Sequence, residues 1–417
     1  MNTFAKNGQY VKFCAYGFLK NLRFFDAFLL LFFLENGISY TQIGVIYAVR
    51  EMVVNFSEIP SGILADSYGR KNSLIAAFAS YIISFFIFYF SDNFYTFLIA
   101  IILYGIGDAF RSGTHKGMIM DYLKLNNWQD QNVAYYGQTR SWSQKGSAIS
   151  ALFAGILVLY TGDYQSIFLY SVVPYLLNFL NIYSYPNELN FSSSSKKRKQ
   201  AKAKGLLFTF KSFIEVIREP KVFQLIHSAA LHTSFLKAVK DYIQPVMVHV
   251  ALLIPLLMDI DTKRKSGIVI GVIYFFIFLL TSYASKNAAK VATLKWKNLS
   301  RLTLVVGLIA GASCGLLYRF EYWLLSLLAF VVIYVLENLR KPLLTGAIAD
   351  QVPNEILTSV FSAQSFWGTI LTSLLALSLG ILADSVGIGL AFVLISVFLL
   401  MGVGLIAVLD KGKQGKL

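Results

Sequence analysis

Long apolar runs alternate with short polar segments along the whole chain. The runs recur at about the twenty-residue length with which a helix spans a bilayer, so they predict a series of membrane helices. The seventh run is too long for one straight span and contains Pro245 and Pro255, so we expect a kink in it or an end near Pro255. The predicted helices cover residues 12–35, 41–64, 72–90, 95–121, 134–160, 166–185, 222–257, 266–285, 299–318, 321–349, 357–382 and 388–409.

The composition supports this interpretation. Hydrophobic residues make up 56% of the 417 residues and charged residues only 14%, which is less charge than a soluble domain of this size carries. We therefore expect an integral membrane protein that is helical where it meets lipid. The formal net charge of +15 would suggest nucleic-acid binding in a soluble protein, but here most of it falls in predicted loops, so no nucleic-acid partner is expected. The only cysteines, Cys14 and Cys314, provide neither a disulfide framework nor metal-ligand spacing.

The basic loops predict the orientation. Segments 36–40, 91–94 and 161–165 contain no Lys or Arg, whereas basic residues flank both ends of the chain and fill segment 196–204. By the positive-inside rule, both termini and a basic linker over 190–220 are expected in the cytoplasm, in a bacterial inner membrane. Within the linker, residues 205–219 predict a short helix on the membrane surface. The basic segment 263–265 falls in a loop placed outside, against the rule.

One stretch between the second and third runs has a distinctive pattern. It reads Glu-Ile-Pro-Ser-Gly-Ile-Leu-Ala-Asp-Ser-Tyr-Gly-Arg-Lys-Asn over residues 58–72. We interpret it as a tight loop with opposite charges, Asp66 and Arg70, at its rim, and with glycines at 62 and 69 that allow close backbone approach. The pattern G-x-L-A-D-x-x-G-R-K resembles the signature loop of the major facilitator superfamily. The candidate gating residues are Gly62, Asp66, Gly69 and Arg70.

The resemblance implies an all-α membrane fold of twelve transmembrane helices in two pseudo-symmetric six-helix bundles, here 1–189 and 221–417, that works by alternating access. An internal repeat agrees with it, because four short patterns recur in the same order with offsets of 217 to 229 residues. The resemblance also implies that Asp66 meets the N-terminus of the eleventh helix. The repeated pairs include 43–47 with 270–274, 18–20 with 235–237, Asp108 and Arg111 with Glu337 and Arg340, and Trp142 with Trp367.

Ionisable residues concentrate on the predicted first, fourth, seventh and tenth helices, which in this family line the central cavity. Such residues cost a few kcal/mol inside a membrane unless they face protein or water. On three of these helices bases outnumber acids, which favours an anionic substrate, bound at mid-membrane between the halves. The candidate substrate-binding residues are Lys20, Arg23, Arg111, Arg140, Lys145, Lys237, Lys240 and Arg340.

Embedded carboxylates are the candidates for proton coupling, because desolvation favours their protonated form. Each embedded charge has an alternative role in a structural salt bridge, notably in the pairs Asp108/Arg111 and Glu337/Arg340, which lie three residues apart on one helix face. The candidate proton-coupling residues are Asp26, Glu58, Asp108, Asp241 and Glu337.

Motifs of enzyme chemistry are absent from the sequence. His227 and His232 are five residues apart, which does not place both on one helix face for a metal, and there is no nucleophile elbow or P-loop. We expect a monomeric, cofactor-free secondary active transporter, not an enzyme, that is driven by protons and moves a small organic anion. The alternatives are a multidrug exporter of amphiphilic compounds and a non-transporting sensor or lipid scramblase of the same fold.

Overall fold

The computed structural model describes residues 6–128, 131–190, 220–255, 261–292, 299–351 and 354–414, and every regular element in these ranges is a helix. The all-α fold class is therefore confirmed. The chain divides into two compact units. The first unit comprises residues 1–36, 49–210 and 259–278, and the second comprises 37–48, 211–258 and 279–417. The six-helix halves with boundaries at 189 and 221 remain a prediction.

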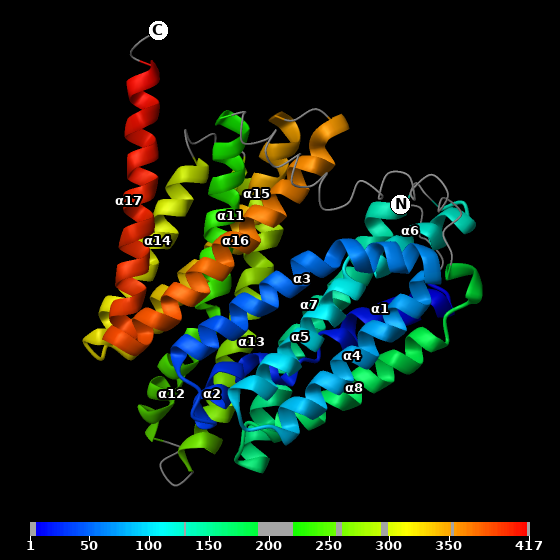
Figure 1. The fold of residues 1–417 in the computed structure, drawn as a ribbon, viewed down its shortest axis with the longest axis horizontal. Coiled ribbons are helices and arrows are strands. Elements are labelled where there is room, and N and C mark those ends of the chain that lie inside the picture. Colours follow the sequence, from blue (N-terminus) through cyan, green and yellow to red (C-terminus); the bar gives the residue numbers. More distant parts are fainter. Residues whose placement is uncertain are drawn as a thin grey trace. The chain divides into compact units, whose positions relative to one another are not determined.

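The first unit is built of helices alone (Figure 1), and aromatic side chains pack between them. The α4 helix packs against α5 and α8, and α1 packs against α7 and α8. Phe168 of α8 lies 4.6 Å from Phe32 of α2 and 4.8 Å from Phe88 of α4, between ring centroids, in a core without solvent exposure. The elements are α1 (Gly8–Lys20), η1 (Phe24–Ala27), α2 (Leu29–Glu35), most of α3 (Tyr40–Tyr68), α4 (Arg70–Phe90), α5 (Phe94–Arg111), α6 (Thr114–Leu125), α7 (Asn132–Thr161), α8 (Ser166–Tyr183) and η3 (Asn187–Leu189).

In the second unit, α14 packs against α15 and α17, and α11 packs against α16 and α15. Small residues permit these contacts, since a side chain at Gly315 of α14 would overlap the backbone of Gly389 in α17. A buried apolar cluster that includes Ile226, Ile348 and Val360 joins α11, α15 and α16. The elements are α11 (Pro220–Val239), η4 (Lys240–Tyr242), α12 (Ile243–Leu252), the later part of α13 (Thr262–Ala292), α14 (Leu299–Arg319), α15 (Trp323–Gln351), α16 (Asn354–Val386) and α17 (Ile388–Gln414).

Three predicted spans are interrupted. The first span breaks between α1 and α2, and the fourth breaks at Ser112–Gly113, where Gly113 has φ +70°. The seventh ends at Leu252 before Pro255, as predicted, but its irregular turn lies at 240–242 and not at Pro245. The signature stretch 58–72 is not a loop: α3 continues to Tyr68, and only Gly69, at φ +98°, separates it from α4. A positive φ is accessible to glycine at no steric cost, so one residue suffices for this turn.

The basic segment 263–265 was assigned wrongly to a loop. Residues 263–265 lie in the first turn of α13, where Lys263 pairs with Glu35 and Lys265 is buried. Segment 263–265 is predicted to lie outside, where positive charge is unfavourable by the positive-inside rule. The pair with Glu35 compensates part of this charge. The α13 helix also continues to Ala292, past the predicted end at 285. The basic linker and the surface helix predicted at 205–219 lie outside the described residues.

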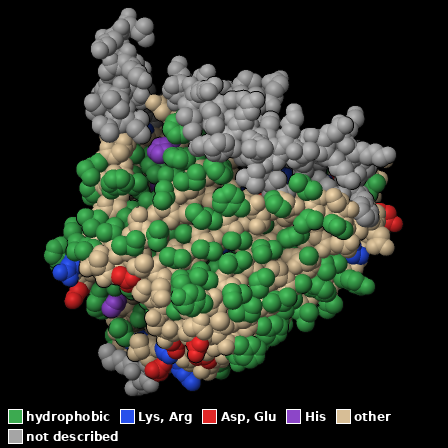
Figure 2. All heavy atoms as spheres, viewed as in Figure 1, with side chains coloured by type: hydrophobic (Ala, Val, Ile, Leu, Met, Phe, Trp, Pro, Cys, Tyr) green, Lys and Arg blue, Asp and Glu red, His purple; other side chains and the backbone are tan. Residues whose placement is uncertain are grey.

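The helices offer lipid a largely apolar surface. Seven described segments are long and apolar enough to cross a membrane: Arg70–Phe90, Phe94–Leu125, Ser166–Tyr183, Thr262–Ala288, Leu299–Arg319, Trp323–Ile348 and Val360–Val386. Figure 2 shows hydrophobic side chains over most of the described surface in that view, with charged ones mainly at its margins. Exposed apolar residues such as Phe86, Phe90 and Leu177 contribute to it. Such residues are stable in contact with acyl chains and would be unfavourable in water.

Glycines bring α7 and α13 into backbone contact within the first unit. A Cβ at Gly155 would lie 2.7 Å from the Gly267 carbonyl oxygen and 3.1 Å from the Gly271 Cα. We expect Gly155→Leu to lower the free energy of unfolding by about 1–3 kcal/mol, because backbone atoms cannot yield as a flexible side chain can. Unfolding of purified protein in mixed micelles measures the change. Gly137→Leu on the same helix is the control, since a Cβ there meets nothing within 4 Å, and an equal effect of both changes would contradict the packing argument.

Candidate functional site

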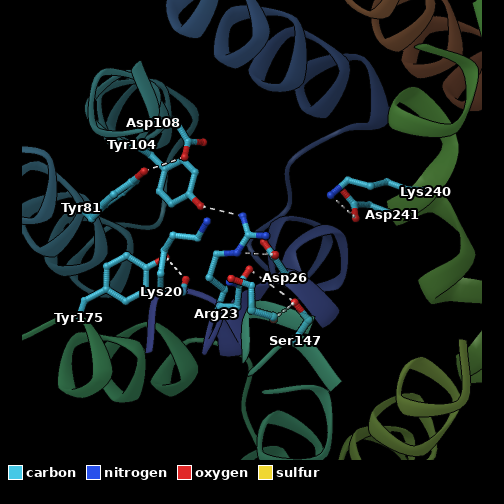
Figure 3. Close-up of polar contacts among 12 residues, drawn as sticks. Lys20, Arg23, Asp26, Tyr81, Tyr104, Asp108, Ser147, Tyr175, Lys240 and Asp241 are labelled. Carbon is cyan, nitrogen blue, oxygen red and sulfur yellow. Dashed lines mark hydrogen bonds and ion pairs between the residues drawn. The ribbon is translucent and has the colours of Figure 1, made fainter. Parts of the chain in front are cut away.

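A first group of embedded charges lies where the first predicted helix is interrupted. Arg23 Nε is 3.1 Å from Asp26 Oδ2, and Arg23 Nη1 donates to the Tyr104 hydroxyl at 3.2 Å. Figure 3 shows these side chains beside Lys20, whose backbone carbonyl accepts a hydrogen bond from Tyr175. Two candidate site residues, Arg23 and Asp26, thus pair with each other, whereas no carboxylate of the described residues lies within ion-pair distance of Lys20.

Asp108 on α5 joins three helices of the first unit. Its Oδ1 lies 3.0 Å from Arg111 Nη2 and accepts a hydrogen bond from the Tyr81 hydroxyl at 2.6 Å, and its Oδ2 lies 3.3 Å from Arg50 Nη2. Arg111 Nε donates to the same Tyr81 hydroxyl at 3.0 Å. The predicted pairing of Asp108 with Arg111 is therefore confirmed. One carboxylate faces two guanidinium groups, so the cluster retains one net positive charge.

A cavity of about 370 Å³ opens beside this cluster in the first unit. Among the described residues, its lining contains Lys20, Arg111, Lys116 and Arg140, together with His115, and no Asp or Glu. Among the described residues, no carboxylate lies within ion-pair distance of Lys20, Lys116 or Arg140. Aromatic rings of Phe13, Tyr16 and Tyr136 complete the walls. Such a lining attracts anions and offers apolar faces to a carbon skeleton.

The second unit has a cavity of about 410 Å³ with a mixed lining. Lys237 of α11 and Lys341 of α15 contribute positive charge, and Glu337 of α15 contributes a carboxylate. Arg340 also reaches this cavity but is 1% exposed. Its Nη atoms donate to Ser300, Thr303 and Ser228, so the guanidinium ties α15 to α14 and α11. The Glu337/Arg340 pair proposed from the sequence is thus replaced by separate contacts.

Other candidate residues lie apart from these cavities. In the second unit, Lys240 Nζ is 3.7 Å from Asp241 Oδ1, a pair that Figure 3 also shows. Lys145 stacks over the Trp142 ring at 4.2 Å and does not line the described cavities. Glu58 is exposed and accepts a hydrogen bond from the Ser112 hydroxyl at 2.8 Å.

The gating candidates have unequal surroundings. Arg70, expected at an exposed loop rim, is buried, and its Nη1 lies 2.5 Å from Asp121 Oδ2 of α6. Gly69 makes the turn between α3 and α4, and the Asn190 side chain occupies the space beside it. Gly62 lies within α3. The side chain of Asp66 lies outside the described part of the chain, so its gating role remains a prediction.

Several residues that complete these sites were not among the sequence candidates. Lys116 and His115 lie in the same predicted span as Arg111, 95–121, so their positions in the sequence gave a usable signal. The sequence gave no such signal for Tyr81, His232 and Thr233, because the residues that they contact lie on other helices. His232 Nδ1 lies 2.8 Å from Glu337 Oε2, and the Thr233 hydroxyl donates to Glu337 Oε1 at 2.5 Å.

Comparison with known proteins relates nearly the whole chain to transporters. A family model described as Major Facilitator Superfamily matches residues 14–375. An uncharacterized MFS-type transporter, YxaM of Bacillus subtilis (strain 168), is 22% identical over 399 residues, which cover 94% of this chain and 92% of that protein.

Solved structures share the fold. The nucleoside transporter NupG aligns with a TM-score of 0.74 at 11% identity over 97% of this chain and 100% of that chain. A POT family transporter in complex with 5-aminolevulinic acid aligns with a TM-score of 0.70 at 14% identity, over 96% and 95% of the two chains. A D-xylose-proton symporter aligns with a TM-score of 0.61 at 14% identity, over 93% and 95%.

Proposed function

This chain belongs to the Major Facilitator Superfamily, and from that premise we propose that it is a secondary active transporter of a small organic anion, coupled to protons. Its family and its apolar helices make it an integral, multi-pass membrane protein. The observation that supports an anionic substrate is the lining of the 370 Å³ cavity in the first unit, whose described residues include four Lys or Arg and no Asp or Glu. A desolvated base makes charge-assisted hydrogen bonds to an anion, which are stronger than neutral ones.

Lys20 in the lining and Asp108 beside it have different roles in this proposal. Asp108 compensates one of the two guanidinium groups that it contacts, which keeps Arg50 and Arg111 stable in a membrane-embedded position. Lys20 is half-buried and has no carboxylate partner in the described ranges. An anionic substrate would provide the missing countercharge. In this proposal Lys20, Lys116 and Arg140 bind the substrate, and Arg111 contributes through its position beside the cavity.

The experiment combines a binding screen with a charge-removing substitution. Purified protein is screened by thermal shift against organic monoanions, dianions, and neutral analogues of the same skeletons. We expect stabilisation by anions only. For the best anion, Lys20→Met should weaken binding by about one to two decades, equivalent to about 1.5–3 kcal/mol for a hydrogen bond to a charged group. Uptake into proteoliposomes, with and without a pH gradient, then tests transport and coupling.

Lys124→Met is the matched control, because Lys124 is exposed on α6 and is not part of the described cavity linings. Equal losses in both variants would mean that net charge alone attracts the anion. Stabilisation by neutral amphiphiles to the same extent would instead favour a multidrug exporter. Binding without uptake under any gradient would favour a non-transporting sensor.

A further inference from the structure

The signature pattern occurs a second time near the end of the chain. The first copy, residues 62–69, reads Gly-Ile-Leu-Ala-Asp-Ser-Tyr-Gly, and the second copy, residues 380–387, reads Gly-Ile-Leu-Ala-Asp-Ser-Val-Gly. In each copy the final glycine alone separates one long helix from the next, α3 from α4 at Gly69 and α16 from α17 at Gly387, with φ +98° and +85°. Nearly identical sequences thus form the same one-residue turn at the ends of α3 and α16.

Asp384 of the second copy caps the start of α3. Its Oδ1 accepts a hydrogen bond from the Tyr40 N–H at 2.9 Å, and its Oδ2 accepts one from the Thr41 N–H at 2.8 Å. A helix leaves its first four N–H groups without a partner within the helix. The other two are satisfied by a capping box, in which the Gln42 N–H donates to the Ser39 hydroxyl and the Ser39 N–H donates to the Gln42 side chain. Asp384 therefore completes the cap, and its negative charge is favourable at the positive end of the helix dipole.

The start of α3 runs antiparallel to α16, with the two backbones in close contact. A Cβ at Gly44 would lie 2.6 Å from the Ala376 carbonyl oxygen, and a Cβ at Gly380 would overlap the Tyr40 carbonyl. These contacts lie within the second unit, to which residues 37–48 belong, whereas the rest of α3 belongs to the first unit. The glycine that opens the second copy thus permits the close approach that the cap requires.

We infer that Asp384 is a second gating residue, which acts at the end of the α3/α16 pair opposite to Asp66. The resemblance implies that Asp66, at the end of α3, meets the start of α16, and Asp384, at the end of α16, meets the start of α3. In the predicted topology the first copy faces the cytoplasm and the second copy faces outside. The second copy lacks the Arg-Lys pair that follows the first, which agrees with the positive-inside rule. This inference rests on the proposed transport by alternating access, but not on the charge of the substrate or on the coupling ion.

Each aspartate stabilises the state in which its own side of the protein is closed. For the outer side to open, the start of α3 must leave α16, and the Tyr40 and Thr41 N–H groups then exchange Asp384 for water. This exchange loses charge-assisted hydrogen bonds, which are stronger than neutral ones. On the cytoplasmic side, the predicted contact of Asp66 has the same effect on the opposite state. The balance of the two contacts therefore sets the populations of the two states.

The test measures these populations without substrate. Spin labels are attached at Asp92→Cys in the first unit and Tyr322→Cys in the second, at exposed positions predicted to lie outside, whereas the native Cys14 and Cys314 are buried. Double electron–electron resonance in lipid nanodiscs then separates outer-open from outer-closed molecules by the distance between the labels. Asp384→Asn retains the shape of the side chain but removes its charge and one acceptor. We expect it to raise the ratio of outer-open to outer-closed molecules about five- to tenfold, the factor that corresponds to the loss of one such hydrogen bond.

Ser385→Ala is the matched control, because Ser385 is the next residue of the second copy and its hydroxyl donates to the Leu382 carbonyl within α16. This variant should leave the ratio unchanged. Asp66→Asn should lower the ratio, and its combination with Asp384→Asn should return the ratio towards the wild-type value. Asp384→Ala removes both acceptors, so it should raise the ratio at least as much as Asp384→Asn and replaces that variant should it fail to fold.

A ratio in Asp384→Asn and Asp384→Ala equal to that of the control, or a shift in the direction expected of Asp66→Asn, would overturn the inference. The result is independent of the anion screen, because no substrate is present. A failed screen with the expected population shifts would contradict the proposed substrate and still support the second gate. Stabilisation by anions with unchanged populations would contradict the second gate alone.

Discussion

Replacing Asp108 by asparagine is expected to lower the free energy of unfolding by about 3–5 kcal/mol. Asp108 is the acid that faces both Arg50 and Arg111, and its side chain is 13% exposed. Removal of its charge leaves two guanidinium groups in a low-dielectric environment without a counterion. Asparagine has nearly the same shape and can still accept the Tyr81 hydrogen bond. The loss of stability therefore measures the effect of removing the charge. Reversible unfolding in mixed micelles measures it.

The double variant Asp108→Asn/Arg111→Gln separates a structural role of Arg111 from a substrate contact. If Arg111 serves only to pair with Asp108, the double variant should regain transport and part of the stability relative to Asp108→Asn, since Arg50 still lacks its counterion. If it binds substrate, stability returns in part while transport stays lost. Asp92→Asn, in an exposed position, is the control and should change stability little. A loss below about 1 kcal/mol in Asp108→Asn would contradict the buried ion-pair network.

Arg70→Met is expected to cost a similar amount, about 3–5 kcal/mol, because it leaves the Asp121 carboxylate unpaired. The two side chains are 5% and 14% exposed, and their charged atoms are 2.5 Å apart. This contact joins the start of α4 to α6 next to Gly117, where a Cβ would lie 2.7 Å from Arg70 Nη1. Arg70→Lys should recover part of the loss, since it retains the charge but not the guanidinium geometry.

The same unfolding measurement tests this second pair. Arg301→Met is the control, because Arg301 is exposed on α14. Asp121→Asn combined with Arg70→Met should be less destabilised than Arg70→Met alone, since the double variant buries no unpaired charge. If Arg70→Met were as stable as the Arg301→Met control, the buried ion pair would be contradicted and Arg70 would behave as a residue at an exposed loop rim.

The sequence by itself determined the class of the protein. Apolar runs of membrane-spanning length predicted helices that the structure confirms to within a few residues at many ends, for example 299–318 against Leu299–Arg319. Hydrophobic length and periodicity are local properties of the chain, so they can be identified without knowledge of the fold. The signature pattern over 58–72 likewise identified the family whose model matches residues 14–375. The prediction for Asp108 and Arg111 also succeeded, because residues three apart share a helix face.

Only the tertiary structure decided which charges meet and which stay unpaired. The same three-residue spacing failed for Glu337 and Arg340, since His232, Thr233 and Ser300 come from neighbouring helices and offer closer partners. The sequence placed Arg70 at the rim of a predicted loop. In the structure it is buried and pairs with Asp121, 51 positions later in the chain. The partners of an embedded charge are set by helix packing, and desolvation makes pairing across helices favourable wherever an acceptor is within reach. Neither condition is a property of local sequence.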